Sequence, residues 1–170
     1  MVISMAKKKS RTAGSTPAIV ALEAAGIPFE VLEYDHDPRS TLNFGMEAAT
    51  ALGRDPASVF KTLMVMADSS LSVGIVPVGG HLDLKALAQA LGAKRAVMAD
   101  QALAQRATGY VVGGISPLGQ KTRHATVLDA SALTHATVLV SGGRRGLDIE
   151  LAPQDLAQLT AAVVAPIARA

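Results

Sequence analysis

Residues 59–78 have the sequence VFKTLMVMADSSLSVGIVPV, and this stretch decides the fold class. Two apolar runs, Val59 to Ala67 and Leu71 to Val78, are separated by the polar segment Asp68-Ser69-Ser70. Apolar runs of this length on either side of a short polar segment are typical of a β-hairpin. We therefore predict that residues 59–78 form two strands joined by a tight turn.

Lys61 is the one charged residue of the first run. Alternation along a strand places Lys61 on the same face as Val59, Leu63 and Val65. A lysine on a buried face is costly unless its charge has a use. If Lys61 faces water instead, it is a charge that guards the strand. The pattern leaves both interpretations open.

Local signals predict further elements on both sides of the hairpin. Thr16 can cap a helix that has proline at its first position and ends at Gly26. Asp83 can cap another helix, with one apolar stripe, that ends at Gly92. We predict further helices over 46–52, from Asp100, and from Pro153 with Leu156, Leu159 and Val163 inward, and strands over 29–34, 110–115, 125–128, 137–141 and 147–151.

The order of these elements favours an α+β fold. It lacks the regular strand–helix alternation of a doubly wound sheet, so we predict a mixed, largely antiparallel sheet covered by helices. Residues 16–170 are predicted to form a single domain. Residues 1–15 are predicted to form a flexible basic tail. Its cations, Lys7, Lys8, Lys9 and Arg11, could contact phosphates or could only keep the tail solvated.

Composition excludes several kinds of chemistry. The chain has 170 residues and no cysteine, so it has no disulfide, no protein thiolate nucleophile and no cysteine metal site. No apolar stretch is long enough to span a membrane, and the first residues lack the apolar segment of a secretory signal. The histidines have no metal-type spacing, and we expect no metal or other cofactor. We expect a cytoplasmic protein.

Two glycine-rich segments each begin at the end of a predicted strand. The first runs from Gly113 to Lys121 and includes Gly114 and Ser116. The second runs from Ser141 to Asp148 and includes two consecutive arginines. Glycine lets a backbone approach a ligand closely, and arginine can bind phosphate, although each segment alone could be an ordinary turn. The similar ends of the two strands indicate one cleft lined by both segments.

Taken together, these segments resemble the YbaK-type Cys-tRNA(Pro) deacylases of the YbaK/prolyl-tRNA-editing superfamily. The resemblance covers nearly the whole chain from Thr16 to the C-terminal helix, and its two longest motifs are GGISPLGQK and SGGRRGLDIE. The matching stretches are residues 34–38, 43–45, 60–63, 82–85, 104–106, 108–110, 112–121 and 140–150.

The resemblance implies a free-standing enzyme that removes cysteine wrongly attached to tRNA(Pro) and that could also deacylate Cys-tRNA(Cys). It also implies a barrel-like mixed sheet flanked by helices. Lys61 matches the essential lysine of the family. The resemblance implies that the substrate thiol attacks its own ester, so the protein orients and stabilises rather than supplying a nucleophile. It implies the acceptor end of aminoacyl-tRNA and prolyl-tRNA synthetase as partners, and neither a membrane nor DNA. The residues placed around the substrate are Tyr34, Phe44, Thr62, Gly113, Gly114, Ser116, Ser141 and Asp148.

Three alternatives stay open at this point. The chain could be a non-catalytic tRNA-binding module, which its basic tail and Arg144-Arg145 would favour. It could also deacylate Ala-tRNA(Pro) by activating water, as other branches of the superfamily do. A small-molecule binder could use the same cleft.

Overall fold

The computed structural model describes residues 15–170. The predicted basic tail therefore lies outside the described residues, except for Ser15. The helices are α2 (Pro17–Ala25), α3 (Phe44–Leu52), α4 (Leu84–Ala90), α5 (Gln101–Thr108) and α6 (Pro153–Thr160), with short 3-10 turns at Pro56–Ser58 and Ala130–Thr134. The strands are β1 (Glu30–Glu33), β2 (Phe60–Ala67), β3 (Ser70–Pro77), β4 (His81–Leu82), β5 (Ala96–Met98), β6 (Ala125–Asp129), β7 (Val138–Arg144), β8 (Leu147–Leu151), β9 (Val163–Ala165) and β10 (Ala168–Arg169).

The predicted hairpin is present and forms the middle of a mixed sheet. Its strands β2 and β3 pair antiparallel from Phe60–Pro77 to Ala67–Ser70. The five-stranded sheet has the order β5-β2-β3-β6-β9, in which β6 pairs parallel with both β3 and β9. This arrangement confirms the α+β fold with a mixed sheet.

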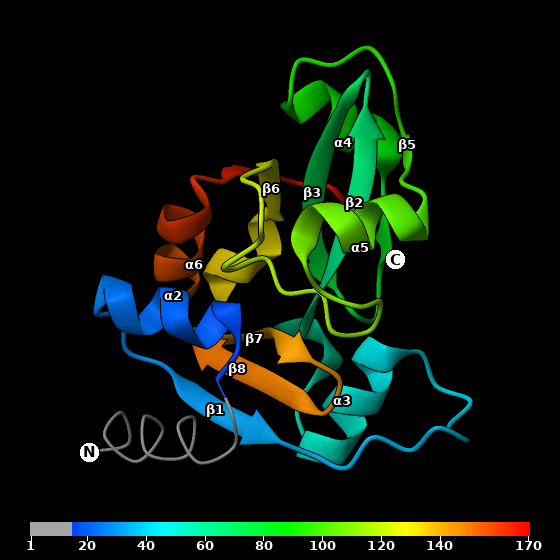
Figure 1. Ribbon diagram of the computed structural model, residues 1–170. Coiled ribbons are helices and arrows are strands. Elements are labelled where there is room, and N and C mark those ends of the chain that lie inside the picture. The colour runs from blue at the N-terminus through cyan, green and yellow to red at the C-terminus, as the bar shows by residue number, and fades with distance from the viewer. Residues whose placement is uncertain (1–14) are drawn as a thin grey trace.

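A second, antiparallel sheet lies at the other end of the molecule (Figure 1). It has the order β1-β8-β7, and an isolated parallel bridge between Val59 and Leu139 connects it to the start of β2. A third, two-stranded sheet pairs β10 with β4. Among the described residues, the strands thus form three sheets that do not close into a barrel.

Side-chain caps fix the helix boundaries. The Thr16 and Asp83 side chains accept hydrogen bonds from the first turns of α2 and α4, as their sequence signals predict. Helix α3 begins two residues earlier than predicted, at Phe44, because the Asn43 side chain accepts the Met46 amide hydrogen. This earlier start puts Phe44 on the first turn of a helix, with its backbone held in place.

Both faces of the five-stranded sheet are buried. Phe60 and Met64 of β2 pack into the larger core cluster with α2, β7 and β8. Val65, on the opposite face, packs with Leu87 of α4 and Ile167. The larger cluster joins the five-stranded sheet and the β1-β8-β7 sheet through one continuous core. The cluster that contains Val65 and Leu87 fixes α4 against the hairpin.

Two details of the prediction are wrong. Residues 110–115 form a loop, because the amide of Tyr110 donates to the Thr108 hydroxyl and that of Val112 to the Gln105 side chain. Side chains of helix α5 thereby accept the amide hydrogens that a strand would donate to a neighbouring strand.

Val163 does not face inward from the last helix. Helix α6 ends at Thr160, Ala161 adopts a left-handed backbone (φ 52°), and Val163 is an exposed residue of β9. Leu156 is buried as predicted.

The helices of residues 15–170 are all too short or too polar to cross a membrane.

Candidate active site

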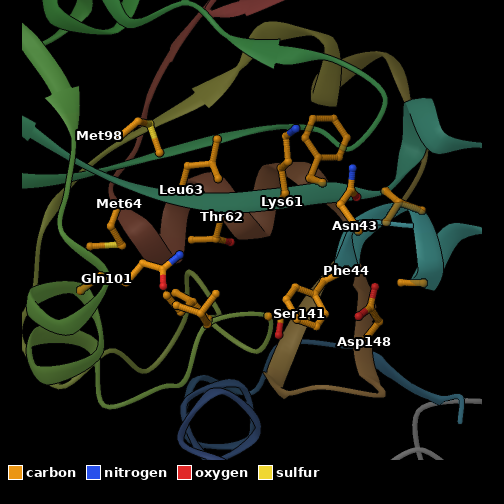
Figure 2. A pocket seen from close by; sticks show the side chains of 18 of the residues that line it. Asn43, Phe44, Lys61, Thr62, Leu63, Met64, Met98, Gln101, Ser141 and Asp148 are labelled. Atoms are coloured by element: carbon orange, nitrogen blue, oxygen red, sulfur yellow. The ribbon is translucent and has the colours of Figure 1, made fainter. Parts of the chain in front are cut away.

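A pocket of about 360 Å³ lies between the start of β2, the first turn of α3, helix α5 and the 110–121 loop (Figure 2). Its polar and charged lining is contributed by Tyr34, Asn43, Lys61, Thr62, Gln101, Ser141 and Asp148. The rest of its lining is apolar or glycine: Phe44, Gly45, Ala48, Val59, Phe60, Leu63, Met64, Met98, Ala99, Ala104, Val112, Gly113 and Ile115. Both glycine-rich segments reach it, as the sequence indicates.

A free strand edge explains why consecutive residues of β2 line the pocket. Strand β5 pairs with β2 over Val65–Ala67, and Ala99 donates to the Met64 carbonyl, so this pairing ends before the first residues of β2. The pocket is consequently lined from both faces of the strand. Figure 2 shows Lys61 and Leu63 on one side of β2, and Thr62 and Met64 on the other.

Lys61 is half-buried, and its ammonium has a specific partner. Its Nζ donates a hydrogen bond to the carbonyl of Gly80 at 2.8 Å. Burial lowers the pKa of Lys61 below its ordinary value, because the charged form is partly withdrawn from water. A cation with one carbonyl partner in a partly dry pocket has N–H donors left for an anionic or carbonyl oxygen.

Thr62 has a buried oxygen without a partner. Among the side chains of residues 15–170, Thr62 Oγ1 is the one buried oxygen or nitrogen atom that has no hydrogen-bond partner. Buried polar groups are normally hydrogen-bonded, so this unpartnered hydroxyl of a pocket residue is a candidate for contact with a ligand.

Replacing Thr62 with valine should stabilise the ligand-free protein. Valine keeps the shape of the side chain and removes a buried hydroxyl whose desolvation is uncompensated, which typically costs about 1 kcal/mol or more. For a chain of this size, we expect the midpoint of thermal unfolding to rise by about 2–4 °C. Scanning calorimetry of the two proteins would measure it.

Thr108→Val is the matched control for this experiment. The Thr108 hydroxyl donates to the Ala104 carbonyl at 2.8 Å and accepts from the Tyr110 amide at 3.2 Å, so its removal should lower the midpoint. A lower midpoint for Thr62→Val as well would show that the Thr62 hydroxyl has a favourable partner in the free protein.

Asp148 is the most strongly perturbed acid of the pocket. It lies in β8 opposite Ser141 of β7, and only 6% of it is exposed. Burial raises its pKa from 3.8 to about 7. Burial, together with the nearby Asp148 carboxylate, raises the pKa of Tyr34 to about 12. At neutral pH this wall therefore has a neutral phenol beside a carboxyl group that is partly protonated.

Phe44 is fixed from both sides. Glu47, one turn further along α3, holds the preceding segment: its carboxylate accepts from the Asp37 amide at 2.8 Å and contacts His36 Nδ1 at 2.8 Å. The His36 ring lies 5.7 Å from the Phe44 ring, centroid to centroid. On the other side, the Arg145 guanidinium lies 4.8 Å from the Phe44 centroid. The aromatic wall of the pocket is thus preorganised.

The structure does not bring every predicted residue to the pocket. Lys61, Tyr34, Phe44, Thr62, Gly113, Ser141 and Asp148 line it, whereas Gly114 and Ser116 do not. Ser116 is fully buried, and its Oγ accepts from the Leu118 amide at 3.2 Å. Gly114 packs against the backbone at Arg144, where a Cβ atom would come within 2.7 Å of the Arg144 Cα. Both residues shape the loop that carries Gly113.

Sequence reasoning missed the apolar end of the pocket. Met64, Met98 and Ala104 line it from β2, β5 and α5, and the polar Gln101 of α5 lies beside them. The short β5 has too few residues for a periodic signal, so the sequence offers no indication that Met98 faces a cavity. Across residues 15–170, no group of three or more histidine, aspartate or glutamate side chains is placed to hold a metal ion.

Comparison with known proteins agrees with the resemblance in the sequence. The family model described as the aminoacyl-tRNA editing domain matches residues 44–159. A protein of Enterococcus faecalis, provisionally named Cys-tRNA(Pro)/Cys-tRNA(Cys) deacylase EbsC, is 34% identical over 161 residues, which cover 92% of this chain and 93% of that protein. The proline–tRNA ligase of Shouchella clausii is 42% identical over 76 residues, which cover 44% of this chain and 13% of the ligase.

A solved structure has the same fold. It is a crystal structure provisionally described as a trans-editing enzyme for prolyl-tRNA synthetase. It superposes with a TM-score of 0.79 and 25% sequence identity, over 91% of this chain and 96% of that chain.

Proposed function

Since this chain belongs to the aminoacyl-tRNA editing domain family and is an aminoacyl-tRNA deacylase of the YbaK type, we propose that it removes cysteine wrongly attached to tRNA(Pro). The observation that carries the proposal is a pocket whose lining combines a lysine ammonium with a largely apolar wall and contains neither cysteine nor histidine. Such a pocket suits a substrate that brings its own nucleophile.

The proposed reaction needs no nucleophile from the protein. The thiol sulfur of the cysteinyl group attacks the carbonyl carbon of its own ester. The bond from that carbon to the terminal ribose oxygen breaks, and the proton that leaves the thiol ends on that oxygen. The products are tRNA with a free terminal hydroxyl and a cyclic thioester of cysteine, which water then opens to cysteine.

We infer roles in this reaction for five of the residues that line the pocket. Lys61 holds the terminal phosphate or ribose, or neutralises charge on the departing oxygen, as a compact cation. The backbone at Gly113 positions the ester carbonyl. Phe44 and Met64 form apolar walls, and Thr62 supplies an uncommitted hydroxyl near the side chain of the substrate. Holding thiol and ester together is the main catalytic contribution.

We propose the acceptor end of aminoacyl-tRNA as the partner in the pocket and prolyl-tRNA synthetase as a second partner. A formal net charge of only +2 provides little non-specific attraction to tRNA, so selection of tRNA(Pro) could be borrowed from the synthetase. Co-purification of the two proteins with tRNA(Pro), compared with either protein and tRNA alone, tests this.

A panel of charged tRNAs tests the substrate. We expect the purified protein to release cysteine from Cys-tRNA(Pro) much faster than alanine or proline from the same tRNA, because only cysteine carries a thiol that can attack the ester. Rates are followed as loss of radiolabelled amino acid from the tRNA. Faster release of alanine would replace the proposal with a water-activating deacylase, and tRNA binding without any release would indicate a binding module.

S-methylcysteinyl-tRNA(Pro) separates the two ways of cleaving the ester. Its sulfur has no proton to lose and cannot form the neutral cyclic thioester. We expect it to persist with the enzyme while Cys-tRNA(Pro) is consumed. Comparable cleavage of both esters would mean that water, rather than the substrate thiol, attacks the carbonyl.

A further inference from the structure

Arg145 ties together two walls of the pocket from a third element. It lies in the turn between β7 and β8, and its side chain is exposed. Its Nε and Nη2 both donate to the carbonyl of Val112, at 2.9 and 2.7 Å. Its guanidinium also lies over the ring of Phe44, 4.8 Å from the centroid. Val112 and Phe44 both line the pocket, so one arginine fixes the 110–121 loop relative to α3.

The position of the Arg145 guanidinium depends on the absence of a side chain at Gly113. Gly113 has a φ of 89°, and a Cβ atom there would lie 2.8 Å from Arg145 Nε and 2.9 Å from the Phe44 ring. Any side chain at this position would therefore displace the arginine, the aromatic ring or both. The absence of a side chain at residue 113 allows the cation to settle at the edge of the pocket.

Arg145 retains N–H donors that make no described hydrogen bond and a positive charge that is in no described ion pair. A guanidinium has five N–H groups, and the Val112 carbonyl takes one from Nε and one from Nη2. The ion pairs found within residues 15–170 do not include Arg145, whereas its neighbour Arg144 pairs with Glu33 at 3.2 Å. The planar guanidinium of a positioned, exposed and uncompensated arginine can donate two N–H bonds to two oxygens of a phosphate group.

We propose that Arg145 binds a backbone phosphate of the single-stranded 3′ end of the tRNA and thereby holds that strand at the edge of the pocket formed by Val112 and Phe44. Its contacts to Val112 and Phe44 place the guanidinium before the substrate arrives, which lowers the ordering cost of binding. The inference rests on the proposed function only for the identity of the ligand as a tRNA end.

Binding of uncharged RNA tests this inference independently of deacylation. The probe is a fluorescent acceptor-stem hairpin of tRNA(Pro) with its CCA end, and the measurement is its Kd as a function of salt concentration. For Arg145→Gln we expect binding that is roughly tenfold weaker at low salt. We also expect the slope of log Kd against log salt to fall by about 0.7, as for the loss of one contact to a single-stranded phosphate.

Arg95→Gln is the matched control. Arg95 is also exposed and its loss changes the net charge equally, but it lies at the start of β5, where only its backbone makes a described contact. Arg95→Gln should keep the wild-type slope of log Kd against log salt.

An unchanged slope in Arg145→Gln, even with lower activity, would reduce Arg145 to a structural contact and overturn the inference. So would wild-type binding without salt dependence. If the wild type binds as expected but does not deacylate Cys-tRNA(Pro), the proposed function fails and the phosphate site stands.

Discussion

Replacing Lys61 with alanine is expected to lower the rate constant of the chemical step in deacylation of Cys-tRNA(Pro) by about 10²–10³-fold, the typical effect of removing one preorganised donor to a developing negative charge. The ammonium is half-buried, where its interaction with an oxyanion or phosphate is stronger than in water. Its contact to Gly80 fixes its place before substrate binds. Single-turnover deacylation measured with excess enzyme gives the chemical step directly.

Two further variants make this result specific. Lys61→Arg keeps the charge but replaces a compact ammonium with a wider planar fork, so we expect little recovery of activity. Lys85→Ala removes an exposed lysine of α4 and should retain wild-type turnover. Thermal unfolding of all three variants checks that the loss of the Gly80 contact does not unfold the protein. Wild-type turnover by Lys61→Ala would remove Lys61 from the mechanism.

Local sequence signals predicted those parts of the fold that local chemistry determines. Thr16 and Asp83 cap their helices because a short polar side chain reaches the free amides of its own first turn. The hairpin formed because its two apolar runs are separated by a turn of minimal length. The alternation in β2 was also read correctly, since Lys61 and Leu63 share one side of the strand (Figure 2).

The errors arose where particular side-chain contacts, rather than hydrophobic periodicity, decide the structure. Residues 110–115 have the apolar composition of a strand, but Thr108 and Gln105 of α5 accept the amide hydrogens of Tyr110 and Val112. A side chain of the preceding helix that replaces a strand partner leaves no pattern in a single sequence. Resemblance to a family could place Gly113 at the pocket, because long motifs carry spatial information that periodicity lacks.

The same limit applies to the pocket. The expectation of one cleft lined by both glycine-rich segments agrees with the structure, in which Gly113 and Ser141 line the same pocket. The free edge at the start of β2 and the wall formed by Met98 could not be predicted. They depend on where the short strand β5 stops pairing, which is set by packing rather than by its three residues.

Asp148→Asn is expected to make the protein more stable at pH 8 than the wild type, and to remove a distinct pH dependence. In the folded protein, burial raises the pKa of Asp148 from 3.8 to about 7. In the unfolded chain the carboxyl group returns to its ordinary pKa. Between about pH 4 and 7, the folded protein thus holds a proton that the unfolded chain has released.

The sign of the effect follows from this difference in bound protons. The free energy of unfolding contains a contribution from neutral, buried Asp148 that is complete below about pH 4, declines as the pH rises, and is lost above about pH 7. The separation between 3.8 and about 7 corresponds to about 4 kcal/mol. Asparagine has the same shape and never ionises, so the variant should lack this decline.

Urea unfolding of both proteins at intervals from pH 5 to pH 8 measures the difference directly. We expect the free energy of unfolding of Asp148→Asn minus that of the wild type to increase with pH and to level off above about pH 7. Asp35→Asn, at an exposed position, should follow the wild-type curve. A difference that decreases with pH would mean that the ionised carboxylate has a stabilising partner in the folded state. The expected result would instead show that ionised Asp148 lowers the free energy of unfolding at neutral pH. Such a loss of stability at a residue that lines the candidate active site is typical of a group with a functional role.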